Sequence, residues 1–296
     1  MSKLYENLIY KESIDSTNLE ARRILESCRT GENNDSGSDD SLAADTASFS
    51  AKKPFIVVAR EQTAGRGRQG KSFFSPGGSG IYMTIALPTG DIPSGAVTLT
   101  CRVGIAVSKA IDAEFRCRTG IKWVNDIFLS GRKICGILCE AIRGEDGTPS
   151  HILIGIGINI STEEFPDDIK DSAGSVLSAV GVFRRSSGKG TPLPDENVHP
   201  EGNTQHMTKE FVQAFSMRIY DSVIKHIEPS YDPIADYKDR SVVLGHDVTF
   251  FENGVAHSAH AVDIDASGGL VVRLTDSDEI KTLSSGEISL RVCECV

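Results

Sequence analysis

The segment around residues 55–80 constrains the fold most. Its β-branched, apolar run Phe55–Arg60 predicts a buried strand. A loop of three glycines and three cations follows it, Gly65–Lys71 (GRGRQGK), and then the sequence FFSPGG. The loop matches the letters of a P-loop and of a dinucleotide fingerprint, but both patterns require a helix immediately afterwards. Because the proline- and glycine-rich sequence cannot propagate a helix, both interpretations are excluded.

The loop carries a local positive charge on an acidic chain. Arg66, Arg68 and Lys71 lie close together in a protein whose formal net charge is −10. Their mutual repulsion is relieved by an anion, and the planar guanidinium groups suit a phosphate. We therefore expect an anion-binding loop; a flexible surface loop with scattered charge is the alternative. The overall acidity disfavours a general nucleic-acid binder.

The remainder of the first 240 residues alternates helical and strand-like patterns. Thr17 followed by Glu20 fits a capping box at the start of the first helix. The expected helices are 15–26, 94–115 and 208–228, and the expected strands are 81–87, 120–124, 127–130, 133–142 and 151–160. Polar segments at about 30–53 and 184–205 are predicted to be disordered insertions.

The pattern changes near residue 240. Short strands are expected at 242–244, 247–252, 257–264, 269–274 and 280–283, separated by glycine-containing turns. Their spacing is typical of a small β-barrel. The sequence thus predicts two domains, an α+β domain over 1–239 and a β domain over 240–296, without internal repeats.

The cysteines and the hydropathy of the chain indicate the cellular compartment in which the protein is expected. The chain has seven cysteines but no paired metal-binding spacing, so we expect reduced thiols and no metal ion bound by side chains. No apolar run reaches the roughly 20 residues needed to span a bilayer, and the amino terminus lacks a signal-peptide pattern. We expect a cytoplasmic protein without a membrane partner.

A series of motifs, taken in order and with its spacing, resembles the biotin–protein ligases. The motifs are DSTN (15–18), EQTAGRGRQG (61–70), KWVND (122–126), RKICGIL (132–138) and GIGIN (155–159), and a weaker match resumes at GEISLR (286–291). The resemblance implies a class II synthetase-like mixed sheet flanked by helices, followed by a small SH3-like β-barrel at the carboxyl terminus.

The resemblance also implies a reaction. Biotin and ATP would form biotinyl-5′-AMP, with Mg²⁺ accompanying the ATP, and a lysine of a biotin carboxyl carrier domain would then accept the biotin. Lys133 would contact both the carboxylate and the α-phosphate. Arg66 and Arg68 would hold phosphates, and Asp126 would orient or deprotonate the acceptor lysine.

The resemblance assigns further positions to each ligand. For biotin these are Ser16, Thr17, Asn18, Gln62, Gly65, Arg66, Trp123, Lys133, Gly136, Gly155 and Gly157. For the nucleotide they are Arg66, Gly67, Arg68, Phe73, Asn125, Lys133, Asn159 and Arg291. Short hydroxyl and amide groups suit the ureido ring, and glycines on one strand face let a ligand lie against a sheet. Core packing is the alternative for Trp123, and helix capping for Ser16 or Thr17.

Departures from the family pattern keep other functions open. Val124 stands where the family usually has proline, and Phe73 where some members have a tryptophan over the adenine. The segment before Ser13 is too short for a helix-turn-helix domain, so no DNA partner is expected. The alternatives are a lipoate-type ligase and a non-catalytic biotin- or anion-binding relative. An exposed sheet edge could serve both a homodimer and acceptor docking.

Overall fold

The computed structural model describes residues 7–30, 52–91, 95–187, 207–252, 254–284 and 288–290. Arg291 and most of the two predicted insertions lie outside these residues. Contacts divide the chain into two compact units, Met1–Ile92 with Arg132–Asp221, and Pro93–Gly131 with Ser222–Val296. Residues 93–131 thus group with the carboxyl-terminal part, whereas the predicted domain boundary at residue 240 stays a prediction.

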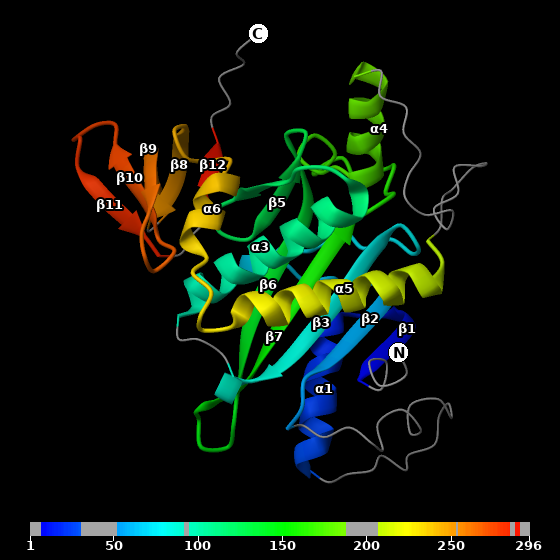
Figure 1. The fold of residues 1–296 in the computed structure, drawn as a ribbon. Coiled ribbons are helices and arrows are strands. Elements are labelled where there is room, and N and C mark those ends of the chain that lie inside the picture. The colour runs from blue at the N-terminus through cyan, green and yellow to red at the C-terminus, as the bar shows by residue number, and fades with distance from the viewer. Residues whose placement is uncertain are drawn as a thin grey trace. The chain divides into compact units, whose positions relative to one another are not determined.

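The first unit is built on a mixed sheet (Figure 1). Its strands lie in the order β1 (Leu8–Ile14), β2 (Phe55–Gln62), β3 (Gly80–Pro88), β7 (Pro149–Asn159) and β6 (Arg132–Arg143). The β1–β2 pair is parallel and the other pairs are antiparallel. The continuous apolar stretches in β2 and β3 match strands covered on both faces.

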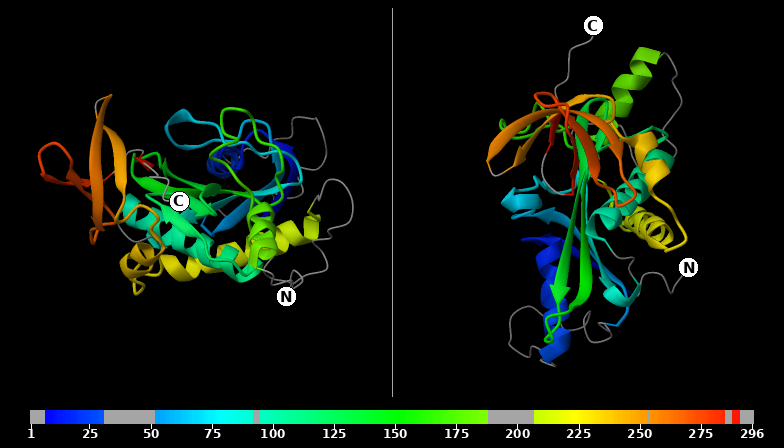
Figure 2. Two further views of the ribbon diagram at one scale, coloured as in Figure 1. Left: turned by 90° about the horizontal axis from the view of Figure 1, so that it is seen from above. Right: turned by 90° about the vertical axis from the view of Figure 1, so that its left-hand side faces the viewer.

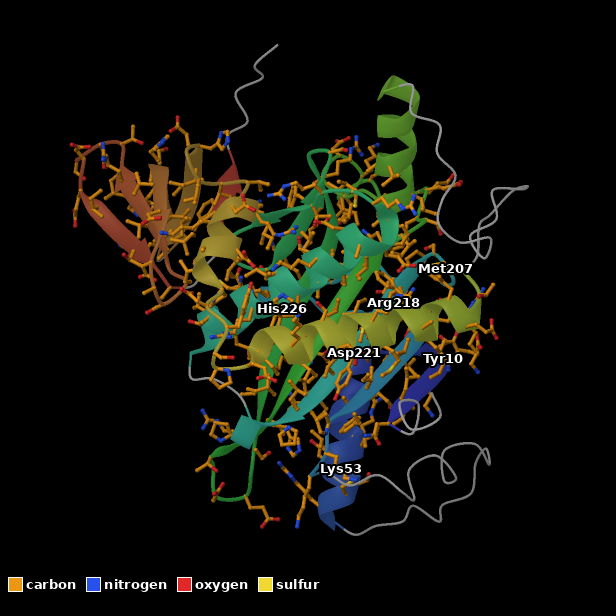
Figure 3. The ribbon with its side chains drawn as sticks, viewed as in Figure 1. Tyr10, Lys53, Met207, Arg218, Asp221 and His226 are labelled. Atoms are coloured by element: carbon orange, nitrogen blue, oxygen red, sulfur yellow. The ribbon has the colours of Figure 1, made fainter. Side chains whose placement is uncertain are left out.

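Helices cover both faces of this sheet. Helix α1 (Thr17–Thr30) packs Ala21, Ile24 and Leu25 on one face, together with Phe55 and Val57 of β2. The view from above places the strands between α1 and the first part of α5 (Lys209–Ile227) (Figure 2). The Lys209 amine of α5 lies 4.6 Å from the centre of the Tyr10 ring on β1, and Figure 3 labels Tyr10 near this end of the helix. The predicted mixed sheet flanked by helices is confirmed.

One helix of the first unit departs from prediction. Helix α4 (Val176–Ser187) includes residues 184–187, which the sequence assigned to the second polar insertion. Val176 and Val180 are buried, and an apolar face of this kind stabilises a helix irrespective of the polar residues at its end. The rest of the insertion predicted at about 184–205 lies almost entirely outside the described residues, so the insertion itself stays a prediction.

The second unit combines α3 (Ala96–Phe115), the hairpin of β4 (Gly120–Lys122) and β5 (Asp126–Leu129), α6 (Ile234–Arg240) and an antiparallel sheet. The strands of this sheet are β8 (Asp247–Glu252), β9 (Val255–Ile264), β10 (Leu270–Leu274), β11 (Ile280–Leu283) and β12 (Ile288–Leu290). They lie in the order β11-β10-β9-β8-β12. The predicted small carboxyl-terminal β structure is thus confirmed.

Two elements of this unit differ from the sequence prediction. Val242–Leu244 is not a strand of the sheet, because the Val242 N–H donates instead to the Ile121 carbonyl of β4 at 3.0 Å. Helix α6 was not expected. Its start is fixed by Asp232, whose side chain accepts a hydrogen bond from the Ile234 N–H at 3.0 Å.

Candidate functional site

The parallel pairing of β1 and β2 brings two of the motifs together. Ile14 at the end of β1 is in register with Gln62 at the end of β2. Beyond the strands, the Thr63 and Ala64 N–H groups donate to the carbonyls of Ile14 and Asp15, each at 2.9 Å. The DSTN segment and the start of the glycine–arginine loop therefore lie side by side, as a shared site requires.

The first turn of α1 contacts Gln62. The Thr17 N–H donates to Gln62 Oε1 at 2.8 Å, and the Thr17 hydroxyl lies 3.2 Å from the same oxygen. The predicted capping box is wrong, because Thr17 already belongs to the helix and the Glu20 carboxylate accepts from Arg23 at 3.1 Å. Before the helix, Asp15 accepts from the Ser16 N–H at 2.7 Å. The Arg23 hydrogen bond lowers the pKa of Asp15.

Two polar residues that sequence reasoning missed complete this end of the site. The Thr84 hydroxyl of β3 lies 2.6 Å from Asn18 Oδ1 and 2.8 Å from the Thr17 hydroxyl. Asn18 Nδ2 donates to Glu140 Oε2 of β6 at 2.7 Å. Both residues carry a sequence signal, since each is a single polar residue within an apolar strand pattern. A polar side chain buried as fully as Thr84 requires hydrogen-bond partners.

Three glycines form a strip on the face of the sheet that carries α1. Gly136 and Gly157 are cross-strand partners, and Gly155 lies two residues from Gly157 on the same face. A Cβ added to Gly155 would lie 2.4 Å from Asn18 Oδ1, and one added to Gly157 would lie 2.5 Å from Phe73 Cε1. We call Gly136, Gly155 and Gly157 the glycine floor. Other groups approach it closely only because side chains are missing there.

Lys133 lies beside the glycine floor. Its Nζ is 3.4 Å from the position that a Cβ on Gly136 would take. Its backbone is held on both sides, because its N–H donates to Ser172 and its carbonyl accepts from Gly174, each at 2.9 Å. The amine is thereby placed at the opposite end of the floor from Asn18.

The glycine–arginine loop forms a small hairpin. Arg66 bridges to Ser72, the Gly67 N–H donates to the Lys71 carbonyl at 2.7 Å, and the Phe73 N–H donates to Gly65 at 2.9 Å. A short 3₁₀ turn, η1 (Arg68–Gly70), forms the tip, where Gly70 has a φ of 75°. No α-helix follows the loop, which confirms the exclusion of a P-loop. The Arg66 side chain is exposed and Arg68 is half-buried.

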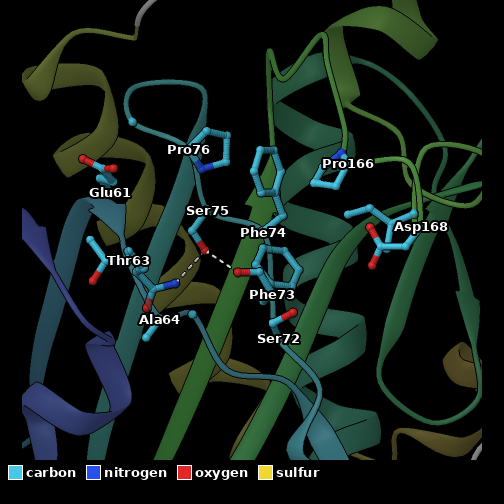
Figure 4. Close-up of a pocket in the computed structure, with 14 residues that line it drawn as sticks. Glu61, Thr63, Ala64, Ser72, Phe73, Phe74, Ser75, Pro76, Pro166 and Asp168 are labelled. Atoms are coloured by element: carbon cyan, nitrogen blue, oxygen red, sulfur yellow. Dashed lines mark hydrogen bonds between the residues drawn. The ribbon is translucent and has the colours of Figure 1, made fainter.

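The loop leads into a cavity of about 470 Å³ (Figure 4). Gln62 Nε2 donates to the Ser75 hydroxyl at 2.9 Å, and that hydroxyl donates to the Phe73 carbonyl at 3.0 Å. The lining residues are Glu61–Gly65, Ser72–Gly77, Pro166, Asp168 and Ile169. Phe74 lines the cavity, and its ring centre lies 6.2 Å from that of Phe165. Sequence reasoning missed this aromatic pair.

Asn159 ends β7 and is 5% exposed. Its Nδ2 donates to the Gly174 carbonyl at 3.1 Å, whereas its Oδ1 is buried and has no hydrogen-bond partner among the described residues. A buried acceptor of this kind costs free energy unless a ligand or water donates to it. Asn159 is therefore suited to bind a polar group.

Three predicted site residues belong to the second unit. Trp123 is 3% exposed, its indole N–H donates to the Gly268 carbonyl at 2.9 Å, and it packs in the core of that unit. These contacts support the core-packing alternative, and a contact of Trp123 with biotin stays a prediction. Asn125 and Asp126 lie at the β4–β5 hairpin. Roles for both, and for Arg291, which lies outside the described residues, also stay predictions.

Two segments of the chain match known protein families. Residues 35–159 match the Biotin/lipoate A/B protein ligase family, and residues 244–291 match the Biotin protein ligase C terminal domain. The chain is thus similar to the biotin/lipoate ligases over the first of these segments and to the carboxyl-terminal domain of the biotin protein ligases over the second.

Individual relatives match over different lengths. The bifunctional ligase/repressor BirA of Bacillus spizizenii is 42% identical over 142 residues, which is 47% of this chain and 43% of that protein. The chain thus matches less than half the length of that relative. The biotin–[acetyl-CoA-carboxylase] ligase of Mycobacterium tuberculosis is 26% identical over 77% of each chain.

A solved structure supports the fold. The biotin protein ligase of Aquifex aeolicus in complex with biotin and ATP superimposes with a TM-score of 0.64 and 23% identity, covering 96% of this chain and 98% of that one. At this identity the likeness concerns the fold alone.

Proposed function

We propose that the protein is an ATP-dependent biotin–protein ligase. One observation carries the proposal: polar groups, the glycine floor and Lys133 follow one another on a single face of one sheet. Asn18 lies against Gly155, and Lys133 lies beside Gly136. A ligand with a polar ring at one end and a carboxylate at the other fits this order, because hydroxyl and amide groups meet the ring and a cation meets the carboxylate.

The first step would join biotin to the nucleotide. A carboxylate oxygen attacks the α-phosphorus of ATP, the bond to the β-phosphate bridging oxygen breaks, and pyrophosphate leaves. Because both reactants are anions, cations must lower the barrier. Lys133 would contact both groups, and Arg66 and Arg68 would hold the phosphates and exclude water from the acyl-adenylate. Mg²⁺ would accompany the ATP and shield its phosphates.

The second step would transfer biotin to a protein. A neutral lysine amine of the acceptor attacks the acyl carbon, AMP leaves, and the amine loses a proton as the amide forms. We assign to Asp126 the orientation or deprotonation of that lysine. The acceptor would be a biotin carboxyl carrier domain, since one relative is named as the ligase for acetyl-CoA carboxylase.

The setting of the reaction is also part of the proposal. The five described cysteines form no disulfide, which supports a reducing cytoplasmic compartment. No helix among the described residues is long and apolar enough to cross a membrane. Self-association as a homodimer through a sheet edge stays a prediction, which analytical ultracentrifugation would test.

Pyrophosphate exchange tests the proposal. Biotin with ATP should support exchange of labelled pyrophosphate, and lipoate with ATP should not. Lys133→Ala should abolish exchange, whereas Lys225→Ala, an exposed lysine of α5, should retain it. Exchange with lipoate alone would favour the lipoate-type ligase. Biotin binding without exchange would favour a non-catalytic relative.

A further inference from the structure

The β9–β10 turn, residues 265–269, is built around one carboxylate. Asp265 Oδ1 accepts hydrogen bonds from the Ser267 and Gly269 N–H groups, each at 2.8 Å. The backbone closes the same turn, because the Asp265 N–H donates to the Gly269 carbonyl at 2.9 Å and the Gly268 N–H donates to the Asp265 carbonyl at 3.0 Å. Gly268 has a φ of 83°, a conformation that favours glycine. The carboxylate thus fixes the shape of a tight turn.

The turn presents the Gly268 carbonyl to Trp123. The indole N–H donates to this carbonyl at 2.9 Å, and the bond is buried, since Trp123 is 3% exposed. Helix α3 supports the turn, because Thr98 Oγ1 donates to the Ser267 carbonyl at 3.0 Å. A Cβ on Gly268 would lie 3.0 Å from Cys101 Sγ of the same helix, so the missing side chain lets the turn approach α3 closely.

Trp123 starts the connection between β4 and β5, which Asn125 completes. Pairing of the two strands closes the base of this connection. Within the connection, the Val124 carbonyl accepts a hydrogen bond from the Tyr237 hydroxyl of α6 at 3.2 Å. The conformation of the connection, and with it the place of Asn125, therefore depends on the bond from Trp123 to the β9–β10 turn as well as on strand pairing.

We infer that Asp265 is a positioning residue for the proposed reaction. It shapes the β9–β10 turn, the turn anchors Trp123, and the anchored connection places Asn125 for the nucleotide. The inference rests on the proposed function, because the role expected of Asn125 in it is to contact ATP. Asp265 acts through Gly268 and Trp123 and is not itself a catalytic residue. In this way the carboxyl-terminal sheet contributes to ATP binding through the β4–β5 connection.

Asp265→Ala tests this role, and Trp123, the single tryptophan of the chain, reports on it. Loss of the carboxylate leaves the Ser267 and Gly269 N–H groups without their acceptor, so the turn loosens and water reaches the indole. We expect Trp123 fluorescence to shift to longer wavelength. The KM for ATP in pyrophosphate exchange should rise about tenfold, because small misplacements of positioning groups are costly. Asp265→Asn should restore both wild-type values, since its amide oxygen can accept the same two bonds.

Asp146→Ala is the matched control. Asp146 Oδ1 also holds a turn between strands, accepting from the Thr148 N–H at 2.9 Å and from the Thr148 hydroxyl at 2.7 Å, but this turn joins β6 to β7. None of its residues is assigned to a ligand. Both alanine variants should lower the unfolding temperature by a similar small amount, whereas only Asp265→Ala should change Trp123 fluorescence and the KM for ATP.

A double-mutant cycle tests the route through Trp123. Trp123→Phe keeps an aromatic ring in the core but removes the indole N–H, so the turn loses its hydrogen bond to the β4–β5 connection. In this background Asp265→Ala should change the KM for ATP less than about twofold. Additive effects of the two substitutions would show that Asp265 acts by another route and would overturn the inference.

The outcomes separate this inference from the proposed function. If the wild type supports biotin-dependent exchange and Asp265→Ala keeps the wild-type KM for ATP, the positioning role is wrong and the ligase assignment stands. An equal rise of this KM in Asp146→Ala would show a general effect of lower stability and would also overturn the inference. Absence of biotin-dependent exchange by the wild type would instead contradict the proposed function, and the inference with it.

Discussion

The ring of Phe73 lies against Gly157, so closely that a Cβ on Gly157 would come within 2.5 Å of Phe73 Cε1. The same ring lies 3.2 Å from the Cβ position of Gly136, across the strand pair. Phe73 was expected over the adenine, whereas its ring covers the floor proposed for biotin. A ligand bound over this part of the glycine floor would therefore compete with the Phe73 ring for the same surface.

Gly157→Ala should impair biotin binding. The added methyl group would occupy the floor and displace the Phe73 ring, and overpacking of this kind costs about 1–3 kcal/mol. We expect the biotin Kd, measured by isothermal titration calorimetry, to rise about tenfold or more. Gly104→Ala is the control, because its Cβ would meet nothing closer than 3.7 Å. Unchanged biotin affinity in Gly157→Ala would show that the ligand does not use this floor.

Arg66→Ala and Arg68→Ala should slow formation of the adenylate. Each removes a cation expected to stabilise developing charge on the phosphates, an effect of about 10²-fold or more in enzymes. Single-turnover measurement of biotinyl-5′-AMP formation checks this. Arg22→Ala on α1 is the control and should react at the wild-type rate. If these variants lose biotin affinity but form the adenylate at the wild-type rate, the two arginines contribute to biotin binding and not to the reaction.

Asn159→Ala should weaken nucleotide binding selectively. The buried Oδ1 has no partner among the described residues, so a donor from the ligand would satisfy it. We expect the KM for ATP to rise about tenfold while the biotin Kd is unchanged. Thr162→Ala nearby, which loses a hydroxyl contact with Ser79, should alter neither constant. Loss of biotin affinity alone would contradict the nucleotide assignment.

His226 should make stability depend on pH below neutrality. Burial lowers its pKa from the ordinary 6.5, partly opposed by a hydrogen bond with the Ser222 carbonyl. A lowered folded-state pKa means that the unfolded chain binds the proton more readily, so stability is fully present above 6.5 and falls as pH drops toward the folded-state pKa. Urea denaturation from pH 7.5 to 5 should show this slope. His226→Gln should flatten the pH dependence of stability. If the variant shows the same slope as the wild type, other titrating groups cause the pH dependence.

Local patterns in the sequence predicted much of the fold. The strands around the glycine–arginine loop and the hairpin at residue 131 follow from β-branched runs and turn residues, which act over a few positions. The proline and glycine after Phe74 predicted that no helix would form there, and the structure has none at these residues. The assignment of both Lys133 and Gly136 to the biotin site came from the family motif rather than from physical patterning, and it stays a prediction.

Features that depend on distant partners were missed. Glu140 looked like one polar residue in a strand, and its importance appears only when Asn18, far away in sequence, comes within 2.7 Å. Val242–Leu244 has strand-like residues, but a bond to Ile121 determines its conformation. Both the hydrogen-bond partner of a side chain and the conformation of such a segment depend on tertiary contacts, which override local propensity.

The parallel register of β1 and β2 has an evolutionary consequence. Parallel strands require a crossover, and here Ile14 and Gln62 meet at the strand ends that carry the site. The crossover enters β2 at Phe55, at the far end of the strand from Gln62. The length of the crossover can therefore change without altering the register of β1 and β2 at the strand ends that carry the site. The polar stretch after Thr30 is a place where related chains can gain or lose residues, and where an epitope tag could be inserted with activity retained.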